Sequence, residues 1–200
     1  YVTFNPHQRG FSSCPGTYTN IAILDSLLKS AKTRKNNLTV VFLDISKAFD
    51  TVGHQHIMNT LGILNIPRKL KLIIMELQKG NSTVIEAQGR RTDPININCG
   101  VLQGAPLSPA LYNIATDFIL DELTEPTISA KYGYQLVPHQ PNLTCMGFAD
   151  DTVIIANNQE NAAILTNMAK ESFYEIGLQL NASKFVSINI VKGKIKNIVP

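Results

Sequence analysis

Two neighbouring carboxylates stand inside an otherwise apolar stretch of the sequence. Asp150 and Asp151 follow the segment CMGFA and precede the segment TVII. Buried like charges are costly unless a cation or a tight turn accommodates them. A β-hairpin that turns at residues 149–151 meets this condition and presents Asp150 at its tip. Taken alone, the pair also fits an ordinary surface turn, because Asp is common in turns.

A third carboxylate lies at the end of a second apolar run. Residues 38–43 (LTVVFL) are rich in β-branched side chains, the pattern of a strand buried on both faces, and Asp44 follows directly. If the two strands lie side by side, Asp44, Asp150 and Asp151 converge. Three acids in a small volume suit Mg²⁺. Two such ions, roughly 3.5–4 Å apart, activate a hydroxyl and stabilise the leaving oxygen of a phosphoryl transfer.

Three segments, in this order along the chain, resemble the palm of a reverse transcriptase: residues 42–50 (FLDISKAFD), 100–109 (GVLQGAPLSP) and 148–151 (FADD). Two further segments, residues 8–11 (QRGF) and 50–56 (DTVGHQH), are similar to those of type-1 non-long-terminal-repeat retrotransposons that insert into ribosomal RNA genes. The resemblance covers nearly the whole chain. It implies an α+β fold, a right-hand polymerase palm with part of the fingers, in which an antiparallel sheet is backed by helices.

The resemblance also implies a domain organisation. Residues 1–200 would be a fragment of a reverse transcriptase domain, with residues 1–37 part of the fingers and residues 38–200 mainly palm. Residues 66–99 would connect fingers and palm. The thumb and the endonuclease domain of such proteins would lie outside these residues. Because the thumb holds the duplex, residues 1–200 alone are expected to bind nucleic acid weakly and to extend primers poorly.

The activity implied by the resemblance is RNA-directed DNA polymerisation with two Mg²⁺ ions, for which Mn²⁺ substitutes. Asp44 and Asp150 would hold both ions, with Asp151 a weaker ligand, and the main chain from Ile45 onward would receive the triphosphate. The implied partners are an RNA template, a DNA primer supplied by nicked target DNA, and deoxynucleoside triphosphates, with no membrane. The implied location is the nucleus.

Four further residues have a role in the family and a simpler interpretation from the sequence. Phe49 would collide with the 2′-hydroxyl of a ribonucleotide, or it packs in the core. Gln103 and Gly104 would contact the nucleotide and the template strand, or they only shape a loop before a helix. Lys184 would protonate the leaving pyrophosphate, or it is a surface lysine. Ala105 stands where family members often carry an acid, and this departure concerns template handling rather than metal binding.

The composition is that of one folded unit. Two hundred residues, 44% hydrophobic and 16% charged, are enough to bury a sizeable core, which excludes a disordered chain. A net charge of +3 and a pI near 8.7 suit a nucleic-acid partner without proving one. Cys14, Cys99 and Cys145 are odd in number and far apart, so neither a disulfide framework nor a zinc site is expected, and the compartment is expected to be reducing.

Hydrophobic periodicity and turn residues predict the remaining elements. Helices are expected over residues 18–32, after Asp50, over residues 110–123, and from residue 159 to Gly177. A further helix is expected from residue 67, with an apolar stripe formed by Leu70, Ile73, Ile74 and Leu77. A hairpin is expected around residues 88–91, and a variable loop or hairpin over residues 124–143. Asp50 suits a helix N-terminus better than a metal. His54 and His56, two apart, are poorly spaced as ligands on one helix face.

Two other functions remain open from the sequence. The first is a group II intron-type or other cellular reverse transcriptase, against which the segments 8–11 and 54–56 argue. The second is a non-catalytic, RNA-binding scaffold with the same fold. A lost acid would mark such a scaffold, whereas all three acids are present here.

Overall fold

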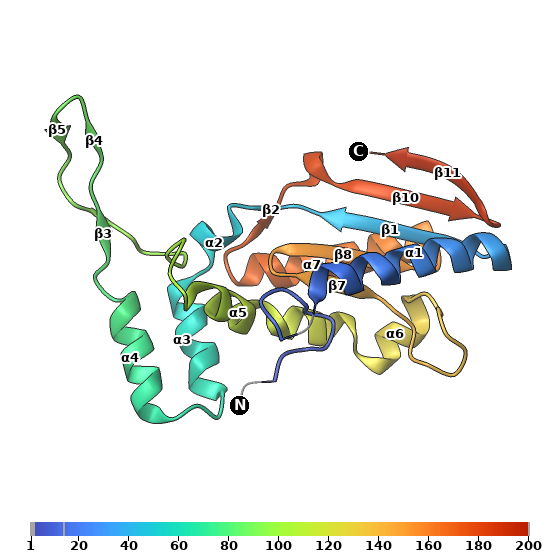
Figure 1. The fold of residues 1–200 in the computed structure, drawn as a ribbon, viewed down its shortest axis with the longest axis horizontal. Coiled ribbons are helices and arrows are strands. Elements are labelled where there is room, and N and C mark those ends of the chain that lie inside the picture. The colour runs from blue at the N-terminus through green and yellow to red at the C-terminus, as the bar shows by residue number, and fades with distance from the viewer. Residues whose placement is uncertain (1–2, 14, 200) are drawn as a thin grey trace.

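An antiparallel sheet of five strands forms the centre of the molecule (Figure 1). The computed structural model describes residues 3–13 and 15–199. The strands lie in the order β11-β10-β1-β8-β7, and each neighbouring pair is antiparallel. Their bounds are β1 Leu38–Leu43, β7 Cys145–Phe148, β8 Asp151–Ala156, β10 Val186–Val191 and β11 Lys194–Val199. The predicted antiparallel sheet is therefore confirmed, with the apolar run before Asp44 at its centre.

Helices cover both faces of this sheet (Figure 1). The helices α5 (Ser108–Leu123) and α7 (Gln159–Glu175) pack on one face, and α1 (Gly16–Arg34) packs on the other. Successive side chains of β8 point to opposite faces of the sheet. Ile154 therefore packs in the larger core, with α5 and α7, and Ile155 packs in the smaller core, with α1. The continuous apolar runs of β1 and β8 follow from this double coverage.

The boundaries of α7 agree with the turn residues that predicted them. The side chain of Asn158 accepts a hydrogen bond from the backbone N–H of Asn161 at 2.8 Å, which caps the first turn. At the other end, Gly177 has φ +87°, a left-handed conformation that costs glycine little and ends the helix.

The connection between residues 64 and 107 extends away from the sheet (Figure 1). After α3 (His54–Ile63) come α4 (Arg68–Gln78) and a hairpin built from two short ladders, β3 (Ser82–Thr83) with β6 (Ile95–Asn96) and β4 (Glu86–Ala87) with β5 (Arg90–Arg91). The predicted hairpin is confirmed, in two pieces.

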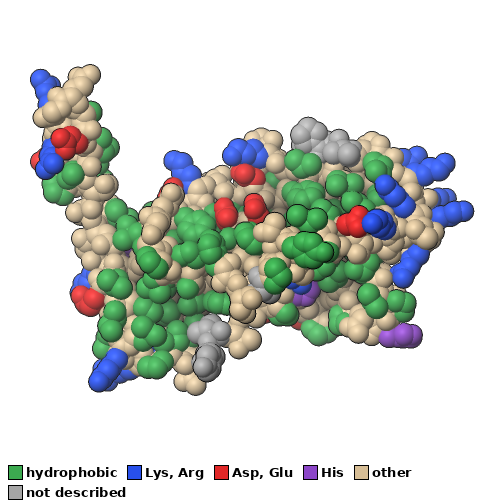
Figure 2. Space-filling model, viewed as in Figure 1, with side chains coloured by type: hydrophobic (Ala, Val, Ile, Leu, Met, Phe, Trp, Pro, Cys, Tyr) green, Lys and Arg blue, Asp and Glu red, His purple; other side chains and the backbone are tan. Residues whose placement is uncertain are grey.

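The predicted apolar stripe of α4 is only partly buried. Ile74 is in the core, whereas Leu70, Ile73 and Leu77 are about half exposed. The reason is that α3 is the main neighbour of α4 among the described residues, so the rest of the stripe stays exposed. Apolar side chains accordingly form much of the surface in this part of Figure 2.

The prediction of a loop or hairpin over residues 124–143 was wrong in its first half, which forms α6 (Pro126–Tyr132). The carboxylate of Glu125 accepts hydrogen bonds from the backbone N–H groups of Thr127 and Ile128, and Pro126 occupies the first helical position. Within residues 124–143, Tyr134 and Leu143 pair as an isolated antiparallel bridge.

Among the described residues, no helix is both long enough and apolar enough to cross a membrane. Cys99 is an exposed free thiol and Cys145 a buried one, whereas Cys14 lies outside the described residues.

A glycine-containing loop packs tightly on the short helix α2 (Ala48–Thr51). The backbone N–H groups of Gly100 and Val101 donate to the carbonyl oxygens of Val52 and Phe49, both at 2.7 Å. Gly100 has φ +83°, and a Cβ added to it would lie 2.5 Å from the carbonyl oxygen of Asp50. The close approach of two backbones therefore requires glycine at this position.

Replacing Gly100 with Ala should destabilise the protein more than the same change at Gly104. Gly104 has φ +84°, but among the described residues no heavy atom lies within 4 Å of its added Cβ. Both variants should lose about 1–2 kcal/mol to left-handed strain, and Gly100→Ala a further 1–3 kcal/mol to the clash. Chemical denaturation of the two variants measures the difference, and equal losses would contradict the packing described here.

Candidate active site

Asp150 occupies the turn of the hairpin formed by β7 and β8. The register pairs Phe148 with Asp151 and Met146 with Val153, so the two-residue turn consists of Ala149 and Asp150. Ala149 has φ +56°. The predicted hairpin with Asp150 at its tip is therefore confirmed, but its turn is shorter than the predicted residues 149–151, because Asp151 is already the first residue of β8.

Asp44 follows β1, the strand that pairs with β8. The last pair in this register is Leu43 with Thr152, so one further step along it brings Asp44 opposite Asp151. Burial, and then the negative charges of Asp150 and Asp44, raise the pKa of the Asp151 carboxyl above its ordinary value. Asp44, which is distant in sequence, thus lies in one electrostatic environment with Asp150 and Asp151. Figure 2 shows acidic side chains gathered near the middle of this face of the molecule.

Lys184 is the cationic neighbour of Asp44. Its Nζ lies 3.5 Å from Asp44 Oδ2, an atom that is shielded from solvent and has no hydrogen-bond partner among the described residues. Lys184 comes from the short 3₁₀ helix η1 (Ala182–Lys184), which follows β9 (Gln179–Leu180). Because β9 pairs with β2 (Ile45–Ser46), the chain directly after Asp44 holds the lysine in place.

The carboxylates alone do not form a closed metal cage. Across residues 3–13 and 15–199, no three His, Cys, Asp or Glu side chains are grouped so that they could hold a metal ion. Mg²⁺ at nucleotide sites is usually bound through one or two carboxylates together with substrate phosphates. Asp44 Oδ2 has Lys184 Nζ at 3.5 Å but forms no hydrogen bond with the described residues, and its place near the charges of Asp150 and Asp151 fits an ion of that kind.

Phe49 lies on α2, five residues after Asp44, and is half-buried. Its ring stacks on the ring of Tyr112 from α5, with centroids 4.7 Å apart and planes 16° apart. Burial, followed by the charges of Asp150 and Asp151, raises the pKa of Tyr112. The stack therefore borders the acidic site, and Phe49 both packs against the core and keeps part of its surface exposed.

Gln103 is exposed and forms a hydrogen bond with the same helix, α2. Its Nε2 donates to Asp50 Oδ1 at 2.7 Å. His54 links α3 to the loop at Gly100, because its Nε2 lies 2.7 Å from the carbonyl oxygen of Gly100. The ring of His56 likewise bonds the carbonyl oxygen of Ala115 at 2.8 Å. Both histidines thus link neighbouring elements through backbone carbonyl groups.

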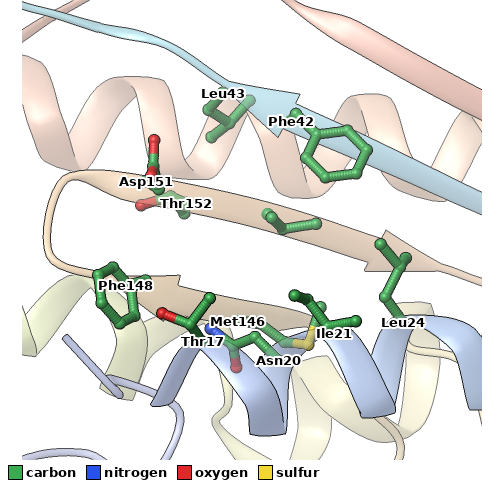
Figure 3. Close-up of a pocket in the computed structure, with 11 residues that line it drawn as sticks. Thr17, Asn20, Ile21, Leu24, Phe42, Leu43, Met146, Phe148, Asp151 and Thr152 are labelled. Carbon is green, nitrogen blue, oxygen red and sulfur yellow. The ribbon is translucent and has the colours of Figure 1, made fainter. Parts of the chain in front are cut away.

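An open cavity of about 440 Å³ adjoins the acids on the α1 side of the sheet. In Figure 3, Asp151 points from β8 toward the end of β1, and Phe42, Met146 and Phe148 line the wall with residues of α1. Most of this lining is apolar. Asp151 thus borders an apolar cavity on the α1 side of the sheet, whereas Phe49 packs against the larger core.

Two residues that border the site received no role from the sequence. Tyr112 lies on α5 amid an apolar helical pattern, and nothing in its spacing distinguishes it from other core residues. Gln8 forms hydrogen bonds with the turn residue Ala149, 141 positions away. Its only local signal is the nearby Gly10, which often marks a close backbone approach.

Comparisons with known proteins identify the family and the fold. The family model for reverse transcriptase (RNA-dependent DNA polymerase) matches residues 2–193. The Pol polyprotein of the type-1 retrotransposable element R2 of Popillia japonica is 34% identical over 193 residues, which are 94% of this chain and 26% of that protein. The polyprotein of the type-2 element R2DM of Drosophila melanogaster is 30% identical over 98% of this chain and 18% of its own length. The chain thus spans about a quarter or less of these relatives.

Solved structures support the fold. A truncated apo telomerase of Candida tropicalis superposes with a TM-score of 0.61 at 15% identity, over 90% of this chain and 40% of that one. A telomerase of Candida albicans in complex with a fragment of telomeric RNA gives a TM-score of 0.63 at 14% identity, over 94% of this chain and 34% of that one. At such identities the likeness concerns the fold alone. Together with the family match and the R2 relatives, it establishes that the chain belongs to the reverse transcriptase (RNA-dependent DNA polymerase) family.

Proposed function

We propose that this chain is the catalytic palm of an RNA-directed DNA polymerase from an R2-like non-long-terminal-repeat retrotransposon. The observation that carries the proposal is the placement of Asp44 and Asp150 at the ends of paired strands, within one electrostatic environment. The substrates would be an RNA template, a DNA primer and deoxynucleoside triphosphates. As in target-primed reverse transcription, a nick in nuclear DNA would supply the primer.

The carboxylates of Asp44 and Asp150 would hold two Mg²⁺ ions, with Asp151 a weaker ligand. When bound, the ions lower the pKa of the primer 3′-hydroxyl and neutralise charge on the triphosphate. Lys184, with an exposed ammonium group beside Asp44, can turn from this carboxylate to the departing phosphates. The protein must then place the 3′-oxygen in line with the α-phosphorus, because small displacements cost orders of magnitude in rate.

The bonds exchanged are those of a single nucleotidyl transfer. The primer 3′-oxygen forms a bond to the α-phosphorus, and the bond from this phosphorus to its bridging oxygen breaks. The hydroxyl proton passes to solvent, and pyrophosphate leaves with a proton from Lys184. Main-chain groups of residues 45–48 would face the triphosphate, since this segment follows Asp44 directly.

The remaining site residues would select and orient the substrates. Phe49, whose ring stacks on the ring of Tyr112, would lie under the sugar of the incoming nucleotide. The loop with Gln103 and Gly104 would lie against the nucleotide and the template, and the Gln103–Asp50 hydrogen bond would fix its position. The apolar cavity beside Asp151 is suited to the sugar and base of the primer terminus.

Asp44→Asn and Asp150→Asn should each lower primer extension on an RNA template by at least about a hundredfold, because each removes charge from the site where charge develops. Asp151→Asn should cost less. The assay uses the longest expressible chain that contains residues 1–200, with the unfolding temperature of every variant measured in parallel. Asp25→Asn, an exposed acid paired with Lys29 on α1, is the matched control. Retention of more than half the activity by Asp44→Asn would refute the proposal.

Phe49→Ala should lower discrimination against ribonucleotides by about tenfold or more, because it removes the group that collides with a 2′-hydroxyl. The ratio of kcat/KM for a deoxynucleotide and its ribonucleotide measures this. Phe118→Ala, the same change at a partly exposed Phe of α5, is the control. Unchanged discrimination in a folded Phe49→Ala variant would assign Phe49 to core packing alone.

A further inference from the structure

The N-terminal segment lies along the outer edge of β7, the strand that leads into the catalytic turn. Gln8 and Gly147 form a parallel bridge. The backbone N–H of Gly147 donates to the carbonyl oxygen of His7 at 2.9 Å, and that of Arg9 donates to the carbonyl oxygen of Gly147 at 3.0 Å. The segment therefore acts as a short extra strand at this edge of the sheet.

The side chain of Gln8 continues this contact into the turn. Its Oε1 accepts from the backbone N–H of Ala149 at 2.9 Å, and its Nε2 donates to the carbonyl oxygen of the same residue at 3.1 Å. Oε1 also accepts from the N–H of Gly10 at 2.9 Å. Gln8 is 6% exposed, so these bonds are shielded from water. The carboxamide supplies an acceptor and a donor on two separate atoms, one for the N–H and one for the carbonyl oxygen of Ala149.

Ala149 needs such support because its conformation is unfavourable. At φ +56° it lies in the left-handed region, which costs a residue with a Cβ about 1–2 kcal/mol. It directly precedes Asp150. A turn that relaxed from this conformation would redirect the Asp150 carboxylate.

The other side of the contact is fixed to the body of the protein. Gly10 comes so close that an added Cβ would lie 2.1 Å from the Ala149 nitrogen. The carbonyl oxygen of Gly10 accepts from Asn113 Nδ2 of α5 at 2.9 Å. Further back, the backbone N–H of Asn5 donates to the Asp117 carboxylate at 2.9 Å. Gln8 thus connects the catalytic turn to α5, the helix that also supports Phe49 through Tyr112.

We propose that Gln8 is a positioning residue of the polymerase: its carboxamide holds Ala149 in the left-handed conformation that directs Asp150 to the metal site. The inference rests on the catalytic role proposed for Asp150. Gln8 itself touches neither the nucleotide nor the primer. Its loss should therefore lower kcat and raise the Mg²⁺ concentration needed for half-maximal activity, with a smaller effect on the KM for deoxynucleotides.

The test compares Gln8→Leu and Gln8→Asn in the longest expressible chain that contains the domain. Leu removes the amide, whereas Asn keeps it but is one methylene too short to reach both groups of Ala149. The matched control is Gln78→Leu, because Gln78, at the end of α4, is equally buried at 7% exposure. Both Gln8 variants should lose about tenfold or more in kcat, against little change in the control. If Gln8→Leu does not fold, Gln8→Asn carries the comparison.

Ala149→Gly provides a rescue experiment. Glycine adopts positive φ without strain, so the turn no longer depends on the amide. The loss caused by each Gln8 substitution should therefore be several-fold smaller in the Ala149→Gly background. Equal losses in both backgrounds, or a folded Gln8 variant with wild-type kcat and Mg²⁺ dependence, would overturn the proposal. Asp150→Asn, measured alongside, separates the two assignments. If Asp150→Asn stays active, the catalytic role proposed for Asp150 fails. If Asp150→Asn is inactive while the Gln8 variants keep full activity, only the role proposed for Gln8 fails.

Discussion

The repulsion between like charges at the ends of β1 and β8 is the constraint on which the rest of the structure depends. Asp44, Asp150 and Asp151 lie close enough for the first two to raise the pKa of the third. A flexible chain would relieve this repulsion by moving the strand ends apart. The fold prevents this, because β1 and β8 pair along five residues between two apolar layers. In the proposed function, the same negative charges would bind divalent cations, and the cations would in turn neutralise the triphosphate.

Around this centre, each supporting element fixes one component of the site. The antiparallel register sets Asp44 against Asp151, and the ladder between β2 and β9 brings Lys184 to Asp44. The loop at Gly100 binds the backbone of α2 and so fixes Phe49. The N-terminal segment fixes the turn at Ala149. α5 is the common support, since it carries both Tyr112 and Asn113.

The sequence predicted the parts of the site that local patterns encode. Alternating and continuous apolar runs place β1, β7 and β8, and the acids at their ends follow from the position of the turn. Asn158 and Gly177 mark the ends of α7 by their capping chemistry. Each of these signals depends on residues within a few positions of one another, which is why they could be read without the structure.

What the sequence did not reveal depends on distant partners. The carboxamide of Gln8 forms a hydrogen bond with Ala149, 141 positions away, and the ring of Tyr112 on α5 stacks on the ring of Phe49 on α2. The exposure of α4 could not be predicted either, since its apolar pattern is the same whether or not a neighbour covers it. The helix α6 was missed because its N-cap residue is not Asp or Asn; the carboxylate of Glu125 caps its first turn instead.

The proposed mechanism requires that Asp44 and Asp150 share bound cations during nucleotide addition. The most direct test is the anomalous diffraction of Mn²⁺ in crystals of the protein with a deoxynucleoside triphosphate. We predict a peak in contact with both carboxylates and with the triphosphate, and movement of Lys184 Nζ away from Asp44 Oδ2, from which it lies 3.5 Å in this structure. A peak that touches neither carboxylate, or only one of them, would contradict it.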